Sequence, residues 1–234
     1  MSIGIVVPAF RPDVDALRAY VRELDAELDP GTIRIEIDDP EPTVIESLAD
    51  LPATVNAVSG RRGKGAAVTA GFEALDADVL AFVDADGATP VSSVVRVVDP
   101  VARGETPVAV GSRRHPESTV TSHQGHLRRL LGDGFAWDLE LLAIAGASDF
   151  EMREVPIAWE DKPGSTVAPV RDTLSMFAGL VRARHRAGVV AGSRLHASLD
   201  IDPGPSLVEE SVSADVDGAT DRSVDRSTDA RSRR

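Results

Sequence analysis

Short apolar runs alternate with stretches of helical pattern along the first half of the chain. The β-branched runs are IGIVVP, TIRIEI, ATVNAV, DVLAFVD and PVAVGS, and amphipathic stretches separate them. This alternation predicts parallel strands joined by helical crossovers, with helices on both faces of the sheet. We therefore expect an α/β fold with a Rossmann-like, mostly parallel sheet.

The stretch from about Pro12 to Leu28 has the clearest helical pattern. Proline stands at its start, Pro30-Gly31 follows its end, and apolar residues recur on one stripe, at Val14, Leu17, Val21, Leu24 and Leu28. Such a stripe predicts a helix with one buried face.

From about Leu199 the apolar pattern stops. The last residues, including DRSVDRSTDARSRR, are rich in Asp, Ser, Arg and Gly and contain few large apolar side chains. A segment of this composition cannot offset the entropy lost on ordering. We expect one folded domain over residues 1–198 and a disordered acidic and polar tail over 199–234.

The charge balance restricts the partners of the protein. The chain contains 38 acidic and 25 basic residues, for a net charge of −13, and its only lysines are Lys64 and Lys162. This acidity argues against nucleic acid as a partner. It suits a halophilic, salt-rich cytoplasm, where salt screens the repulsion between surface carboxylates.

Missing residue types and patterns exclude several kinds of site. The chain has no cysteine, so disulfides, thiolate catalysis and zinc-thiolate sites are excluded. No apolar run approaches the ~20 residues that span a bilayer, and the start MSIGIVVPAF lacks the pattern of a signal peptide. We expect the protein in the cytoplasm or peripherally on the cytoplasmic face of the cell membrane.

Polar clusters follow the predicted strands where each strand ends. The carboxyl ends of parallel strands share one edge of a sheet, and ligands of open α/β sheets bind there. We expect five clusters to converge on this rim, namely Pro8-Ala9-Phe10-Arg11, Asp38-Asp39, Ser59-Gly60-Arg61-Arg62-Gly63-Lys64-Gly65, Asp84-Ala85-Asp86 and Gly111-Ser112-Arg113-Arg114.

Two of these clusters indicate a site for a metal and a phosphate. Asp84 and Asp86 can offer oxygen ligands to a hard divalent cation, although Asp86-Gly87 equally suits an Asx turn before a helix, and the sequence leaves both open. In the loop RRGKG, glycines let backbone N–H groups approach an anion and Lys64 adds positive charge. The loop does not match a P-loop, and alone it is also compatible with an ordinary helix start. Together the two clusters favour a nucleoside diphosphate bridged by Mg²⁺ or Mn²⁺.

Over roughly residues 3–186 the sequence resembles the inverting GT-A glycosyltransferases, and most closely the dolichyl-phosphate hexose synthases. Six stretches in the same order carry the resemblance: VVPAF, RRGKGAAVTAGFEAL, FVDADGATP, GSRRHPES, WDLELLAIA and EVPIAWEDKPGSTV. The resemblance implies the GT-A fold and transfer of a hexose, with inversion, from a UDP or GDP sugar to a polyprenyl or dolichyl phosphate for lipid-linked glycan assembly or protein N-glycosylation.

The resemblance also implies roles for particular residues. Pro8 and either Asp38 or Asp39 would line the nucleoside pocket. Lys64 would lie near the nucleotide, Asp84 near its ribose-phosphate part, and Asp86 would be the main metal ligand. Arg113 would lie where the donor and acceptor phosphates meet. Of Asp138 and Glu140, which a helix would point to different faces, at most one would face the reaction centre.

Two departures from the family pattern bear on the acceptor side. The first strand ends in AFRPD where the family usually has an Ala-Tyr-Asn-Glu-like sequence, which leaves Asp13 as the only nearby acid. Between about 115 and 135 the chain is shorter than the family by a few dozen residues. The resemblance therefore implies that an acceptor-side segment is absent.

A phosphate acceptor suits the remaining residues. It is already an anion near neutral pH, so the reaction depends on positioning and charge neutralisation more than on a general base. Arginine binds phosphate through two bonds at once, which makes Arg113, Arg114, Arg128 and Arg129 candidate clamps. Both pairs also suit a solvated helix face, and for Arg128 and Arg129 the pattern favours that alternative.

Two further stretches allow alternative interpretations. His123 and His126 suit a metal site or a hydrogen-bonded surface role. The stretch 169–186 predicts a helix that packs on the core or contacts an anionic membrane. For the whole chain, the alternatives to the synthase are a noncatalytic nucleotide-sugar-binding paralogue and a transferase with a different acceptor.

Overall fold

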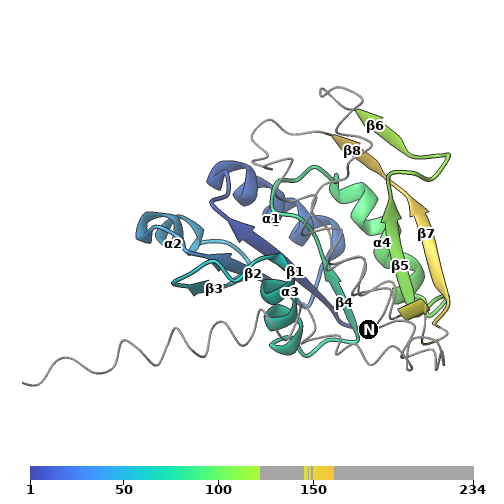
Figure 1. Cartoon of the computed structure of the whole chain (residues 1–234), viewed down its shortest axis with the longest axis horizontal. Coiled ribbons are helices and arrows are strands. Elements are labelled where there is room, and N and C mark those ends of the chain that lie inside the picture. Colours follow the sequence, from blue (N-terminus) through green and yellow to red (C-terminus); the bar gives the residue numbers. More distant parts are fainter. Residues whose placement is uncertain (122–144, 147, 149, 161–234) are drawn as a thin grey trace, which may run out of the picture.

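Four parallel strands form the central sheet of the computed structural model, which describes residues 1–121, 145, 146, 148 and 150–160. Their order across the sheet is β3 (Thr54–Val58), β2 (Thr32–Asp38), β1 (Ile3–Phe10) and β4 (Val79–Phe82) (Figure 1). Each neighbouring pair runs parallel, and Ile5 lies opposite both Ile33 and Ala81. The predicted parallel α/β architecture is confirmed.

Helix α1 (Val14–Leu28) confirms the helix predicted from the apolar stripe. It begins two residues later than the expected Pro12 because Asp13 caps it: Asp13 Oδ1 accepts a hydrogen bond from the backbone N–H of Ala16 at 3.0 Å. The helix ends at Leu28, and the next residue, Asp29, adopts the left-handed conformation.

Helices cover both faces of the central sheet. On one face, α1 and α4 (Val91–Ala102) pack on alternate residues of β1 and β2, including Ile5, Val7 and Ile35. On the other face, α3 (Lys64–Glu73) packs on β1 and β2. A Cβ atom at Gly71 would lie 2.5 Å from Val6 Cγ1, so the absence of a side chain there allows α3 to approach the sheet closely.

The other described strands lie apart from the central sheet. β5 (Val108–Ser112) pairs in parallel with β7 (Met152–Pro156), and β6 (Thr119–Thr121) pairs in parallel with β8 (Ala158–Glu160). Helix α4 contacts β4, β5 and β7, so it lies between the two parts of the fold (Figure 1). The expectation that the fifth predicted strand belongs to the same sheet as the other four is wrong for the described residues, because β5 pairs with β7, a strand that comes much later in the chain.

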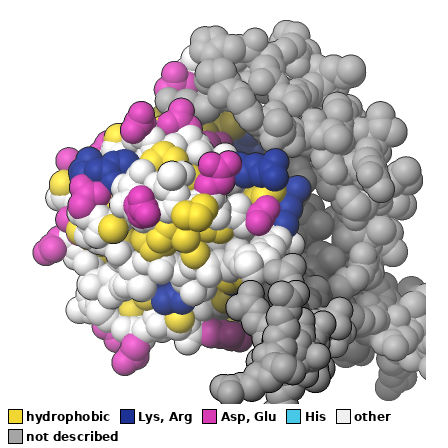
Figure 2. Space-filling view, turned by 90° about the vertical axis from the view of Figure 1, so that its left-hand side faces the viewer, with side chains coloured by type: hydrophobic (Ala, Val, Ile, Leu, Met, Phe, Trp, Pro, Cys, Tyr) yellow, Lys and Arg dark blue, Asp and Glu magenta, His cyan; other side chains and the backbone are white. Residues whose placement is uncertain are grey.

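The surface is acidic, as the composition predicts. Acidic side chains are spread over the visible face in Figure 2, while basic side chains gather in a few places. The short helix α2 (Pro42–Leu48) and its flanks contribute exposed carboxylates at Glu41, Glu46 and Asp50.

Candidate active site at the carboxyl edge of the sheet

The carboxyl ends of β1 to β4 bring four of the five polar clusters to one edge. Phe10 lies opposite Asp38, and Asp38 lies opposite Val58, after which the glycine-rich loop begins. Asp84 and Asp86 follow the end of β4. The sequence prediction of a shared rim therefore holds for these four clusters.

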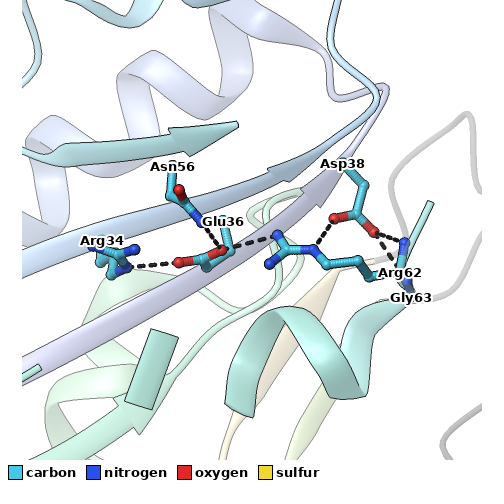
Figure 3. Close-up of polar contacts among 6 residues, drawn as sticks. All are labelled: Arg34, Glu36, Asp38, Asn56, Arg62 and Gly63. Atoms are coloured by element: carbon cyan, nitrogen blue, oxygen red, sulfur yellow. Dashed lines mark hydrogen bonds and ion pairs between the residues drawn. The ribbon is translucent and has the colours of Figure 1, made fainter. Parts of the chain in front are cut away.

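Asp38 holds the glycine-rich loop against the end of β2. Its Oδ2 atom accepts hydrogen bonds from the backbone N–H groups of Arg62, at 2.8 Å, and Gly63, at 2.9 Å. Its Oδ1 atom accepts from Nε of Arg62 at 2.8 Å (Figure 3). Asp38 is only 2% exposed, so both of its oxygens are used within the protein to fix this loop.

A second buried carboxylate extends this network along β2. Glu36 is fully buried and accepts from Arg62 Nη2 at 2.9 Å, Arg34 Nε at 2.6 Å and Asn56 Nδ2 at 2.7 Å (Figure 3). The guanidinium of Arg62 thus lies between two acids, and its pairing with Asp38 and Glu36 outweighs its burial and raises the pKa of Arg62. Charge-assisted hydrogen bonds from the loop backbone and from the side chain of Arg62 therefore hold the loop against the sheet.

Lys64 links this loop to the carboxylates that follow β4. It is the first residue of α3 and follows Gly63, whose φ of +92° favours glycine. Lys64 Nζ lies 2.9 Å from Asp84 Oδ1 and 5.0 Å from the ring centroid of Phe82. The two clusters that the sequence singled out are therefore in direct contact.

Asp86 lies in the turn between β4 and α4. Its Oδ1 atom accepts from the backbone N–H of Ala88 at 2.9 Å, which is the Asx turn that the sequence left open. The residue is exposed, yet protein atoms around its carboxylate raise the pKa of Asp86, and the charge of Asp84 raises it further. This turn uses one carboxylate oxygen, so it is compatible with a metal ligand at the same residue.

Tyr20, which the sequence analysis did not single out, contacts the residues that follow Asp86 in this turn. Its hydroxyl donates to the carbonyl oxygen of Thr89 at 2.7 Å. A Cβ at Gly87, which has a φ of +64°, would lie 3.5 Å from the Tyr20 ring. Burial raises the pKa of Tyr20, and the charges of Asp84 and Asp86 add to this rise, so the hydroxyl stays protonated as a donor.

Phe10 is a second feature that the sequence did not single out. Its ring is 37% exposed at the rim, with the guanidinium carbons of Arg61 at 4.4 Å and Arg11 at 5.1 Å from its centroid. Pro8 lies in the same strand, partly buried, and Asp39 is exposed with a φ of +49°. Phe10 therefore presents an aromatic ring, with two guanidinium groups close to it, at the carboxyl edge of the sheet.

Arg113 and Arg114 follow β5 and lie outside the central sheet. The guanidinium carbon of Arg113 lies 4.6 Å from the ring centroid of Trp159 in β8. The backbone N–H of Arg114 donates to Ser112 Oγ at 3.2 Å, and its side chain is exposed. Arg113 of the fifth cluster therefore contacts β8 rather than the strands of the central sheet.

Several predicted residues lie outside the described part of the chain. These are Asp138, Glu140, Arg128, Arg129, His123, His126, the predicted helix of residues 169–186 and the tail over 199–234. Among the described residues, no helix is long and apolar enough to cross a membrane.

The described carboxylates fit a divalent ion that is shared with a ligand. Asp84 and Asp86 are exposed oxygen donors of the kind that Mg²⁺ and Mn²⁺ bind. Within residues 1–121 and the short later segments, no group of three or more His, Asp or Glu could hold a metal. An ion here would complete its coordination with ligand phosphate oxygens and water.

Comparisons with known proteins find similarity to sugar transferases. Residues 37–149 match the family described as glycosyl transferase family 2, a range that includes Asp38, Lys64, Asp84, Asp86 and Arg113. The chain is 25% identical, over 94% of its length and 45% of the relative, to glycosyltransferase AglD of Haloferax volcanii. It is 26% identical, over 54% of its length and 53% of the relative, to a dolichyl-phosphate beta-glucosyltransferase of Saccharomyces cerevisiae.

The chain spans about half the length of these two relatives. The alignment with AglD extends over 282 residues, more than the 234 of this chain, so AglD contains residues within the aligned region that this chain lacks. This agrees with the shortening expected from the sequence, although the position of the shortening stays a prediction.

A solved structure agrees with the fold. Glucosyl-3-phosphoglycerate synthase of Mycobacterium tuberculosis, in complex with Mn²⁺, UDP and phosphoglyceric acid, superposes with a TM-score of 0.59 at 14% identity, over 78% of each chain. The described part of this chain has the GT-A fold predicted from the sequence, with the parallel sheet and flanking helices described above.

Proposed function

We propose that this chain, of which residues 37–149 match glycosyl transferase family 2, transfers a hexose from a nucleoside diphosphate sugar to a polyprenyl or dolichyl phosphate, with inversion at the anomeric carbon. The relatives named above, a glycosyltransferase and a dolichyl-phosphate beta-glucosyltransferase, support this substrate class. Because both are transferases, they favour catalysis over the alternative of a noncatalytic binding protein.

One observation carries the proposal: Lys64, at the start of α3, pairs with Asp84 at 2.9 Å, two residues before Asp86. The ammonium, the helix N-terminus and two carboxylates thus lie together at the sheet edge. A diphosphate needs positive charge on one side and a carboxylate-bound cation on the other.

On the donor side, Asp84 and Asp86 would hold Mg²⁺ or Mn²⁺. The bound ion would neutralise charge that develops on the departing diphosphate. Lys64 would bind the nucleotide, and its pairing with Asp84 keeps its ammonium directed at that position. Tyr20 keeps the turn of Asp86 in place through Thr89.

We assign the nucleoside to the ends of β1 and β2. Pro8 and the exposed side chain of Phe10 would line this pocket. Of the two acids at the end of β2, Asp39 is the one exposed to a ligand, while Asp38 fixes the loop that carries Lys64.

On the acceptor side, Arg113 and Arg114 would bind the lipid phosphate. An oxygen of that phosphate forms a bond to the anomeric carbon as the bond from this carbon to the diphosphate oxygen breaks. The electron pair leaves with the nucleoside diphosphate, and no proton has to be removed from the acceptor. Asp138 and Glu140 remain proposals for the reaction centre. A lipid acceptor also requires the site to lie at a membrane surface, so we propose peripheral contact with the cytoplasmic face.

The proposal is tested by mixing the protein with labelled UDP-glucose or GDP-mannose, Mn²⁺ and a polyprenyl phosphate in high salt. We expect label in the lipid product with one donor, and none when the free polyprenol replaces its phosphate or when EDTA is present. Metal-dependent donor binding without any transfer would overturn the proposal and favour the noncatalytic alternative.

A further inference from the structure

Strand β8 (Ala158–Glu160) connects the turn that carries Asp86 with the segment that carries Arg113. The backbone N–H of Glu160 donates to the carbonyl oxygen of Ala88 at 2.8 Å, and the N–H of Ala88 in turn donates to Asp86 Oδ1. One residue earlier, the ring of Trp159 lies under the guanidinium of Arg113. A strand of three residues therefore contacts both sides of the proposed reaction site.

Two serine hydroxyl groups hold β8 and the residue before it in place. The fully buried Ser93 of α4 accepts the backbone N–H of Ala158 at 2.9 Å. Ser118 accepts the N–H of Ile157 at 3.1 Å and donates to the carbonyl oxygen of Ser112, the residue before Arg113. The backbones on both sides of the Trp159–Arg113 contact are thus held together, so the indole lies on a rigid support.

We infer that Trp159 is a positioning residue for the acceptor phosphate, because its indole holds the guanidinium of Arg113 at a fixed place relative to the turn of Asp86. The inference rests on the proposed function, since it assigns Arg113 to the phosphate of the acceptor. Trp159 contacts the guanidinium of Arg113 and affects binding of the acceptor phosphate through that group.

The geometry suits this role because the guanidinium carbon of Arg113 lies over the indole ring, 4.6 Å from its centroid, where the guanidinium can stack on the ring. The N–H groups of arginine lie in the plane of the group, at its edge, so a stacked arginine still presents its planar fork to a phosphate. An arginine held by an aromatic face loses less conformational freedom on binding than a flexible one, and this lowers the cost of acceptor binding.

The test uses the full chain and two variants of Trp159. Trp159→Phe keeps a smaller aromatic face, and Trp159→Leu removes it. Arg153→Gln is the matched control, because Arg153 pairs with Glu105 at 2.5 Å near the start of β7, away from Arg113. Two quantities are measured with Mn²⁺ present: the Kd for geranyl phosphate in the presence of UDP, by calorimetry, and the KM and kcat for polyprenyl phosphate.

We expect Trp159→Leu to raise the Kd for geranyl phosphate and the acceptor KM by about tenfold, with donor affinity unchanged within about twofold. Trp159→Phe should recover most of this loss, and Arg153→Gln should match the original chain. Combining Trp159→Leu with Arg113→Gln should weaken acceptor binding no further than Arg113→Gln alone, because both changes remove the same interaction.

Three results would overturn the inference: acceptor affinity unchanged in Trp159→Leu, losses that add in the double variant, or no binding of geranyl phosphate by the original chain. Failure of the proposed function is a separate outcome. If the original chain transfers no sugar but binds geranyl phosphate, and Trp159→Leu weakens that binding, the proposed function fails while the positioning role stands.

Discussion

The ammonium of Lys64 lies 2.9 Å from a carboxylate oxygen of Asp84, and this contact joins the loop after β3 to the turn after β4. Both residues come from separate strand ends that the parallel sheet brings together. The pair balances charge at the sheet edge before any ligand binds. It also places a cation beside the carboxylates that would hold a metal.

Replacing Lys64 should weaken binding of the sugar donor without weakening binding of the metal ion. In Lys64→Met the nucleotide loses a charge-assisted contact, so we expect the Kd for the UDP or GDP sugar to rise about tenfold to a hundredfold. Mn²⁺ alone should bind as well as before or more tightly, because Asp84 no longer pairs with a cation. Calorimetry with each ligand measures both, and Lys64→Arg, which keeps the charge, is the control. Unchanged donor affinity in Lys64→Met would remove Lys64 from the nucleotide site.

The buried network around Arg62 should govern stability. Arg62→Met leaves Glu36 and Asp38 buried with fewer partners, so we expect the free energy of unfolding to fall by about 3 kcal/mol or more. Arg103→Met is the matched control, because Arg103 pairs with Asp99 on the exposed surface and its loss should cost less than about 1 kcal/mol. Urea unfolding of both variants measures the difference. Equal, small losses would show that the network contributes little to the fold.

The carboxyl group of Asp50 should have a pKa well below that of an ordinary aspartate. Hydrogen bonds from Arg18 lower the pKa of Asp50 to about 2. Because the pKa is lower in the folded state than the ~3.9 of an unfolded chain, the pair stabilises the fold above about pH 4, and this contribution is lost as the pH falls through about 2.

Nuclear magnetic resonance of the Asp50 carboxyl carbon measures this titration directly. In Arg18→Gln the pKa should return toward the ordinary value. The exposed position of Asp50 keeps its effect on stability small. An Asp50 pKa that is the same in both proteins would contradict the assigned cause.

Salt should stabilise the fold. The net charge of −13 and the carboxylates spread over the surface repel one another, and salt reduces the range of this repulsion from about 10 Å at 0.1 M to about 3 Å at 1 M. We expect the midpoint of thermal unfolding to rise by at least about 4 °C between these concentrations of KCl. The same midpoint at both concentrations would rule out a halophilic adaptation of the surface.

The local elements and the main rim were predictable from the sequence. The apolar stripe predicted α1 because periodicity is a local property, and only the cap at Asp13 moved its start. The order of strand ends predicted that Lys64 and Asp84 would share an edge, since parallel strands place their carboxyl ends together.

Contacts between distant segments were not predictable. The insertion of Arg62 between Glu36 and Asp38 depends on the path of the loop, which no local pattern encodes. The contacts of Tyr20 with Thr89 and of Trp159 with Arg113 join residues far apart in the chain. The pairing of β5 with β7 is of the same kind and explains why the fifth strand was placed in the wrong sheet.

Asp86 should take part in metal-dependent hexose transfer to a lipid phosphate, and replacing its carboxylate tests this role. Transfer from the active donor to polyprenyl phosphate is measured for Asp86→Asn beside Asp76→Asn, which removes an exposed acid ahead of β4, at the opposite edge of the sheet. We predict that Asp86→Asn lowers kcat/KM at least about a hundredfold while Asp76→Asn leaves it unchanged. Equal activity of the two variants would contradict the account.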